Sequence, residues 1–258
     1  MTSNKRTVET QGDNHMNTHR RAAIFVGIMF IIASVTAVLA KFVFYPPVLT
    51  SPDYLINGAA HSSQVVLGVL MDLTLAVTAI GTAIGLFPVL RPYGERIALG
   101  HLCFRFLEAI VITVGVVAVL SLVTLSQDFV AAAAPDVSAY HTAGTLLLAV
   151  YTWTFMLGPL FFLGVNTLMY SYLLYRSNLV PRPLAALGIT GAILVFGFAL
   201  LVMFGVTDAS APPWVLLALP IGAYEMILAG WLIVKGFNPA VIASAPARTG
   251  TNAVLSPA

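Results

Sequence analysis

Six long apolar runs dominate the chain, and they constrain its fold more than any other feature of the sequence. A helix needs about 20 mostly apolar residues to cross the hydrocarbon core of a bilayer. Each run reaches that length, and short polar segments separate the runs. They cover residues 22–44, 64–90, 97–125, 143–175, 184–206 and 214–234. We therefore expect an all-α polytopic membrane bundle with six transmembrane helices.

The composition of the 258 residues excludes several other classes of protein. Hydrophobic residues make up 59% and charged residues 9%, against about 25% charged residues in soluble domains. A net charge of +2 provides no basic surface for nucleic acid. An outer-membrane β-barrel would alternate apolar and polar residues, whereas here the apolar residues come in blocks. The expected partner is the lipid bilayer, and nucleic acid is not expected.

Basic residues are concentrated on one side of the predicted bundle. The segments 45–63, 126–142 and 207–213 contain no Lys or Arg. By the positive-inside rule, we expect both termini in the cytoplasm and a multi-pass protein of the inner (plasma) membrane. Flexible tails at 1–21 and 237–258 would then flank a transmembrane domain over 22–236. The basic residues of the opposite, cytoplasmic side are Lys5, Arg6, Arg20, Arg21, Arg91, Arg96, Arg176, Arg182, Lys235 and Arg248.

Helix breakers and small residues mark two positions inside the runs. Gly158 and Pro159 lie in the middle of the fourth run, whose length predicts a kinked or tilted helix. Gly81 and Gly85 form a Gly-x-x-x-Gly pattern, which is typical of closely packed helix faces. That face could pack inside one chain or between two chains, so a homodimer is one possible assembly.

Four ionisable residues lie well inside the predicted spans: Asp72, Arg105, Glu108 and Glu225. Each one costs about 2.5–3.5 kcal/mol at the centre of a membrane helix, so such residues face protein, water or one another. Counted from the ends of their runs at about 1.5 Å per residue, all four fall in one middle layer. The hypothesis is that they converge in one buried polar site between the second, third and sixth spans.

Spacing along the helices supports this hypothesis. His101, Arg105 and Glu108 follow one another at i, i+4 and i+7, which places them on one stripe of a helix. Small residues at three- or four-residue spacing flank the other two acids and allow neighbouring helices to approach. These small residues are Gly68 and Ala76 around Asp72, and Gly222 and Ala229 around Glu225.

The predicted site contains three carboxyl groups but a single guanidinium, which cannot lose its proton. The acids that Arg105 does not neutralise would hold protons or bind a cation. This pattern favours a membrane protein that binds or transports a small solute, coupled to a proton or cation. A structural or partner-binding subunit is the alternative, and an intramembrane enzyme acting on a lipid-like substrate is a further one.

Motifs that would identify an enzyme are missing from the sequence. No phosphate-binding G-x-x-x-x-G-K-[ST] loop, H-E-x-x-H zinc pair or G-x-S-x-G nucleophile motif occurs. We assign no catalytic residue, cofactor or metal site. Cys103, the only cysteine, is expected to be a small buried hydrophobic residue. His61 and His141 each begin a span near the outer surface, where they are either interfacial polar residues or a pair that binds a metal or haem.

Several stretches of the chain resemble one bacterial family, domain of unknown function 4386. They are Leu-Phe-Pro-Val-Leu-Arg from residue 86, Ile-Ala-Leu-Gly-His-Leu-Cys-Phe-Arg-Phe-Leu-Glu-Ala from 97, Tyr-Leu-Leu-Tyr-Arg-Ser-Asn-Leu-Val-Pro-Arg from 172, and Glu225 through Trp-Leu-Ile-Val-Lys-Gly-Phe-Asn-Pro from 231. The resemblance covers nearly all of residues 20–238. It implies a multi-pass membrane protein of bacteria and supplies no catalytic residue.

Overall fold

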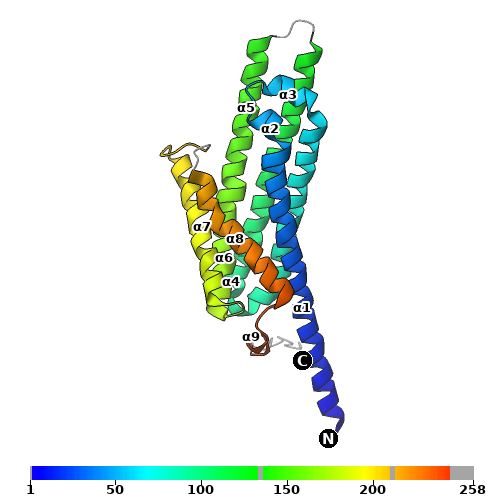
Figure 1. The fold of residues 1–258 in the computed structure, drawn as a ribbon. Helices are drawn as coiled ribbons and strands as arrows, with labels where there is room; N and C mark the ends of the chain where they lie inside the picture. The colour runs from blue at the N-terminus through cyan, green and yellow to red at the C-terminus, as the bar shows by residue number, and fades with distance from the viewer. Residues whose placement is uncertain (1, 133–135, 210–212, 245–258) are drawn as a thin grey trace, which may run out of the picture.

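The computed structural model describes residues 2–132, 136–209 and 213–244, which form helices and contain no strand (Figure 1). Two short segments, η1 and η2, are π-helical and the others are α-helical. In chain order the helices are α1 Thr2–Leu39, η1 Ala40–Phe44, α2 Pro46–Leu49, α3 Tyr54–Ala60, α4 Ser62–Ala131, α5 Val137–Met156, η2 Leu157–Phe162, α6 Leu163–Ser177, α7 Arg182–Met203, α8 Pro213–Val234 and α9 Pro239–Ala243.

Five helices in the described part of the chain are long and apolar enough to cross a membrane. Their outer faces carry large apolar side chains, such as Val77, Leu146 and Leu216, which are 65–69% exposed. A soluble monomer rarely presents so much contiguous apolar surface to water. These helices are therefore suited to a lipid environment. They span Thr18–Phe44, Ser62–Ala131, Val137–Ser177, Arg182–Met203 and Val215–Val234.

Helix α4 is 70 residues long and folds back on itself at Gly94. The backbone there is extended (φ 170°, ψ 81°), and Pro92 just before it has no amide hydrogen to continue the helical pattern. Figure 1 shows the two halves of α4 side by side, one running away from α3 and the other running back. A hydrogen bond from Nε of Arg105 to the carbonyl oxygen of Ala79 (3.2 Å) joins the halves. The second and third apolar runs therefore form one hairpin.

The π-helical segment η2 lies at Gly158 and Pro159, where the sequence predicts a kinked or tilted helix. Proline cannot donate the backbone hydrogen bond that an α-helix requires, and widening the helix by one residue accommodates this loss. The segment connects α5 to α6, so that the two form one continuous helix over Val137–Ser177.

Helix α1 packs against both α4 and α8, and glycines bring these helices close together. A Cβ atom at Gly27 would lie 2.8 Å from the carbonyl oxygen of Ala229 on α8. On α4, Gly81 and Gly85 lie against Met29 and Val26 of α1. The Gly-x-x-x-Gly face therefore packs inside the chain against α1, and the homodimer stays a prediction.

The start of α1 and helix α9 lie at one end of the bundle, which we call the α9 end, and α2 and α3 lie at the opposite α3 end (Figure 1). Helix α1 already begins at Thr2, within the predicted tail 1–21, and α9 lies within the predicted tail 237–258. Residues 245–258 of that second tail are outside the described residues. The flexibility of both tails stays a prediction.

Cys103 is exposed, so the prediction of a small buried residue is wrong. Cys103 lies two residues after His101 and two before Arg105, both of which are buried. Two positions correspond to about 200° of rotation on an α-helix, so the cysteine lies on the face opposite to them.

Candidate functional site

Arg105 and Glu108 form a buried ion pair on the second half of α4. Nη1 of Arg105 lies 2.9 Å from Oε2 and 3.2 Å from Oε1 of Glu108. The two residues are 2% and 3% exposed. Asn166 on α6 donates from Nδ2 to Oε2 of Glu108 at 2.6 Å and to the carbonyl oxygen of Phe162 at 2.8 Å. The pair is thus connected to α6 as well as to the first half of α4.

His101 continues the buried stripe toward the α9 end, as the spacing of His101, Arg105 and Glu108 indicates. It is 1% exposed, and its ring meets that of Tyr170 on α6 edge to face, with centroids 5.0 Å apart. Neither ring nitrogen has a hydrogen-bond partner within the described residues. Oδ1 of Asn166 is also buried without one, whereas the hydroxyls of Thr167 and Tyr170 interact with each other. The layer therefore contains unused polar atoms on His101 and Asn166.

Glu225 on α8 approaches this layer from the side of α1. Its Oε2 accepts a hydrogen bond from the hydroxyl of Ser34 at 3.1 Å. Its charge interacts with those of Arg105 and Glu108. No ion pair within 4.0 Å joins it to Arg105 in the part of the chain that the structure describes. Glu225 is half-buried, with a hydroxyl as its direct partner and no cation in contact among the described residues.

Asp72 lies apart from these residues, toward the α3 end, so the structure does not bring the four charges into one cluster. Its Oδ2 accepts a hydrogen bond from the hydroxyl of Tyr45 at 2.8 Å. Asp72 precedes Ala79, the contact of Arg105, by seven residues on the same helix, which is about 10 Å along its axis. Gly68 leaves room for the Tyr45 ring, because a Cβ there would lie 2.5 Å from ring carbon Cε1.

Lys41 is the residue of this region that sequence reasoning missed. It lies in η1, and its Nζ is 4.2 Å from the ring centroid of Phe155 and 5.2 Å from that of Tyr151. Its charge interacts with that of Asp72. A single basic residue at the α3 end of the first apolar run, opposite to the other basic residues, is the signal that could have identified it.

The small residues around Glu225 do not all pack as expected. Ala229 is fully buried, whereas a Cβ at Gly222 would meet nothing within 4 Å. Before Glu225, the close contact on α8 is made by Ile221 and not by Gly222, because a Cβ at Gly191 of α7 would lie 2.7 Å from the backbone nitrogen of Ile221.

His61 and His141 make separate contacts. Nδ1 of His61 lies 3.1 Å from the carbonyl oxygen of Asn57, and the ring of His141 meets that of Tyr54 edge to face at 5.8 Å. No group of three or more His, Cys, Asp or Glu side chains suited to a metal ion occurs among the described residues. The contacts fit the interpretation of both histidines as polar residues near the end of a span.

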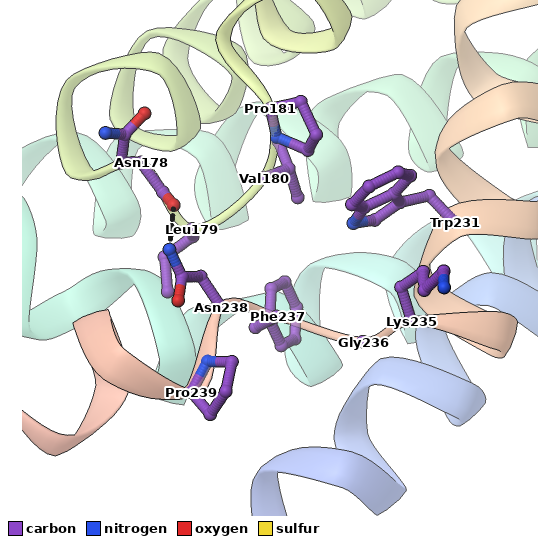
Figure 2. A pocket seen from close by; sticks show the side chains of 10 residues that line it. All are labelled: Asn178, Leu179, Val180, Pro181, Trp231, Lys235, Gly236, Phe237, Asn238 and Pro239. Atoms are coloured by element: carbon purple, nitrogen blue, oxygen red, sulfur yellow. Dashed lines mark hydrogen bonds between the residues drawn. The ribbon is translucent and has the colours of Figure 1, made fainter.

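A cavity of about 420 Å³ opens at the α9 end (Figure 2). Trp231 of α8 and Lys235, the residue after α8, lie on one side of it, and the α6–α7 connection around Val180 lies on the other. Nδ2 of Asn238 donates to the carbonyl oxygen of Asn178 at 3.4 Å and closes one edge. Lys235, the charged residue of this cavity, is exposed.

The chemistry of the buried layer follows from its charges. Arg105 is engaged by both oxygens of Glu108, so the second acid of the layer, Glu225, has no cation within ion-pair distance among the described residues. A carboxyl group in such a position can take up a proton or coordinate a small cation.

Comparisons with known proteins identify a family for this chain. No curated protein and no solved structure matches the chain. One family model matches residues 25–236, which is most of the 258-residue sequence. The chain belongs to the family described as Domain of unknown function (DUF4386).

Proposed function

We propose that the protein crosses the inner (plasma) membrane of a bacterium six times, with both termini in the cytoplasm. Five helices have the length and composition of spans, and α4 contributes two crossings because it folds back at Gly94. An even number of crossings agrees with the position of α9 and the start of α1 at the same end (Figure 1). The basic residues Arg91, Arg96, Arg176 and Arg182 in the connections at that end favour the cytoplasmic side.

We propose further that the protein binds a proton or a small cation in its buried polar layer and couples this binding to a small solute. The observation that carries the proposal is the position of Glu225, which accepts from Ser34 and has no ion-pair partner among the described residues. A carboxylate without a cation in direct contact is costly inside a membrane bundle, and a proton or cation removes that cost.

Proton-coupled flux in proteoliposomes tests this function. The purified protein is reconstituted with a pH-sensitive dye inside the vesicles, and a sodium, potassium or pH gradient is applied. Glu225→Gln removes the charge and nearly preserves the shape, so we expect it to abolish the dye response. Ser34→Ala should weaken the response severalfold, because it removes the hydroxyl that orients the carboxylate.

Glu95→Gln is the matched control. Glu95 is exposed and pairs with Arg91 at 2.7 Å on the surface of the hairpin, so its loss should leave the response unchanged. A folded Glu225→Gln protein with an unchanged response contradicts the proposal.

A structural role for the same layer is the alternative, and one contact favours it: Arg105 ties the two halves of α4 together through Ala79. In that case no gradient produces a response in the native protein, and Glu225→Gln changes only its resistance to unfolding. A partner-binding subunit or an intramembrane enzyme has no specific contact in its favour.

A further inference from the structure

A groove of about 560 Å³ runs along the flank of the bundle in its α3 half. Its walls come from η1 and from α5, with residues of the α7–α8 connection at its edge. The walls are mainly apolar, and Phe42, Leu148 and Phe155 contribute to them. We call this cavity the Lys41 groove, because Lys41 is the only basic residue among the described residues that line it.

The ammonium group of Lys41 lies between two cavities. A smaller cavity of about 40 Å³ shares Lys41, Tyr151 and Phe155 with the Lys41 groove and extends to Asp72. No carboxylate lies within 4.0 Å of Nζ of Lys41 among the described residues. The contacts of Nζ with the rings of Phe155 and Tyr151 hold the ammonium group in place and still leave its hydrogen atoms available to an anion.

Both π-helical segments contribute a residue to the lining of the small cavity. Lys41 belongs to η1, and Pro159 of η2 lines the small cavity beside Asp72. A π-helical segment inserts one residue into a helix, shifts the side chains that follow, and is frequent at functional sites. Here η1 supplies the cation, and the rings of Tyr151 and Phe155 that contact it lie on α5, just before η2.

We infer that the Lys41 groove binds a single-chain carboxylate from the membrane, that is, a fatty acid. The carboxylate would pair with Nζ of Lys41, and the alkyl chain would lie along the apolar wall formed by Phe42, Leu148 and Phe155. Burial of the chain against these side chains supplies most of the binding. The volume of the groove lies within the range of small-molecule sites, about 300–1,000 Å³.

The charges favour a carboxylate over a phosphate headgroup. A phosphate monoester carries about 1.5–2 negative charges at neutral pH and binds best where several donors converge. The groove supplies one cation, while the carboxylate of Asp208 lies on its wall and that of Asp72 lies beyond it. A singly charged headgroup therefore fits better than a doubly charged one.

Equilibrium binding of radiolabelled laurate tests the inference. The native protein is placed in phosphatidylcholine nanodiscs, and binding to empty nanodiscs is subtracted. We expect saturable binding of laurate, weaker binding of dodecanol because it has no charge, and weaker binding of dodecyl phosphate. Lys41→Gln should weaken laurate binding about ten- to a hundredfold, which is the usual contribution of a hydrogen bond to a charged group.

Three further variants make the result specific. Lys41→Arg keeps the charge and should retain laurate binding within a few fold, whereas Thr152→Trp fills the groove and should abolish it. Lys235→Gln removes one charge at the opposite end and should change nothing. Glu225→Gln should also leave laurate affinity unchanged. The fatty-acid site and the proposed proton or cation site are therefore tested independently of each other.

Several results would overturn the inference. The first is the absence of saturable laurate binding by the native protein. The second is that folded Lys41→Gln or folded Thr152→Trp binds laurate as tightly as the native protein does. The third is that the native protein binds dodecyl phosphate more tightly than laurate. Circular dichroism and gel filtration establish which variants are folded. Should Lys41→Gln fail to fold, Lys41→Arg and Thr152→Trp still decide the question.

Discussion

Arg105 and Glu108 form a bidentate ion pair one helical turn apart, with Nη1 of Arg105 at 2.9 and 3.2 Å from the two carboxylate oxygens. Both residues are almost completely buried, so each charge has lost its contact with water and is stabilised by the opposite charge of its partner. Asn166 donates to the same carboxylate and thereby fixes the pair relative to α6.

Removing one member of this pair is expected to destabilise the protein strongly. Arg105→Met or Glu108→Leu leaves a buried charge without its partner, which costs about 3–5 kcal/mol. The double variant removes both charges and should cost much less than the sum of the two. Thermal unfolding in detergent micelles measures this cycle, and additive losses would contradict a direct pair.

The close approach of α1 and α8 leads to a prediction with an internal control. Gly27→Ala would place its Cβ 2.8 Å from the carbonyl oxygen of Ala229, so we expect a loss of about 1–3 kcal/mol. Gly230→Ala on α8 meets nothing within 4 Å and replaces a poor helix former, so stability should stay equal or rise by up to about 1 kcal/mol. Chemical unfolding compares the two variants. Equal stabilities would show that the helices do not pack at Gly27.

The hydrogen bond between Tyr45 and Asp72 is expected to stabilise the α3 half of the bundle. Tyr45→Phe removes the hydroxyl that donates to Oδ2 of Asp72 at 2.8 Å, at a cost of about 1–3 kcal/mol. The same substitution in an Asp72→Leu background should cost clearly less, because the acceptor is already gone. An unchanged cost would mean that the hydroxyl acts through another contact.

The fold-back of α4 at Gly94 predicts which loops share a side of the membrane. In a Cys103→Ser background, a membrane-impermeant thiol reagent added to spheroplasts should label Asp53→Cys at the α3 end. It should not label Glu95→Cys at the hairpin until the cells are opened. Asp53 and Glu95 are both exposed, so burial does not explain a difference between them. Labelling of both sites from outside would contradict the six-crossing topology.

The apolar runs predicted most of the fold because the length and hydropathy of a segment are enough to identify a membrane helix. The break at Gly94 falls between Leu90 and Ile97, where the sequence separates two runs. An irregularity of the helix at Pro159 was also predictable, because proline removes a backbone donor, but its π-helical form was not. That form depends on how the neighbouring helices pack.

The candidate site was predictable only along single helices. Helical spacing alone indicates that His101, Arg105 and Glu108 share one face, and the structure buries all three. Spacing does not indicate which face of another helix lies opposite, and here Asp72 lies with Tyr45 and near Lys41 instead of Arg105. For Cys103, too, the sequence did not indicate which face of the helix is buried. Its apolar neighbours in the sequence suggested burial, but the side chain is exposed.

The central claim is that Glu225 exchanges a proton or cation inside the bundle, and infrared difference spectroscopy of the reconstituted protein tests it most directly. Acidification from neutral to mildly acidic pH should produce a band of a protonated carboxyl group in the native protein. We predict that this band disappears in Glu225→Gln and persists in Glu95→Gln, and that the cation to which Glu225 responds, if added, reduces it. An identical difference spectrum in native protein and Glu225→Gln would contradict the account.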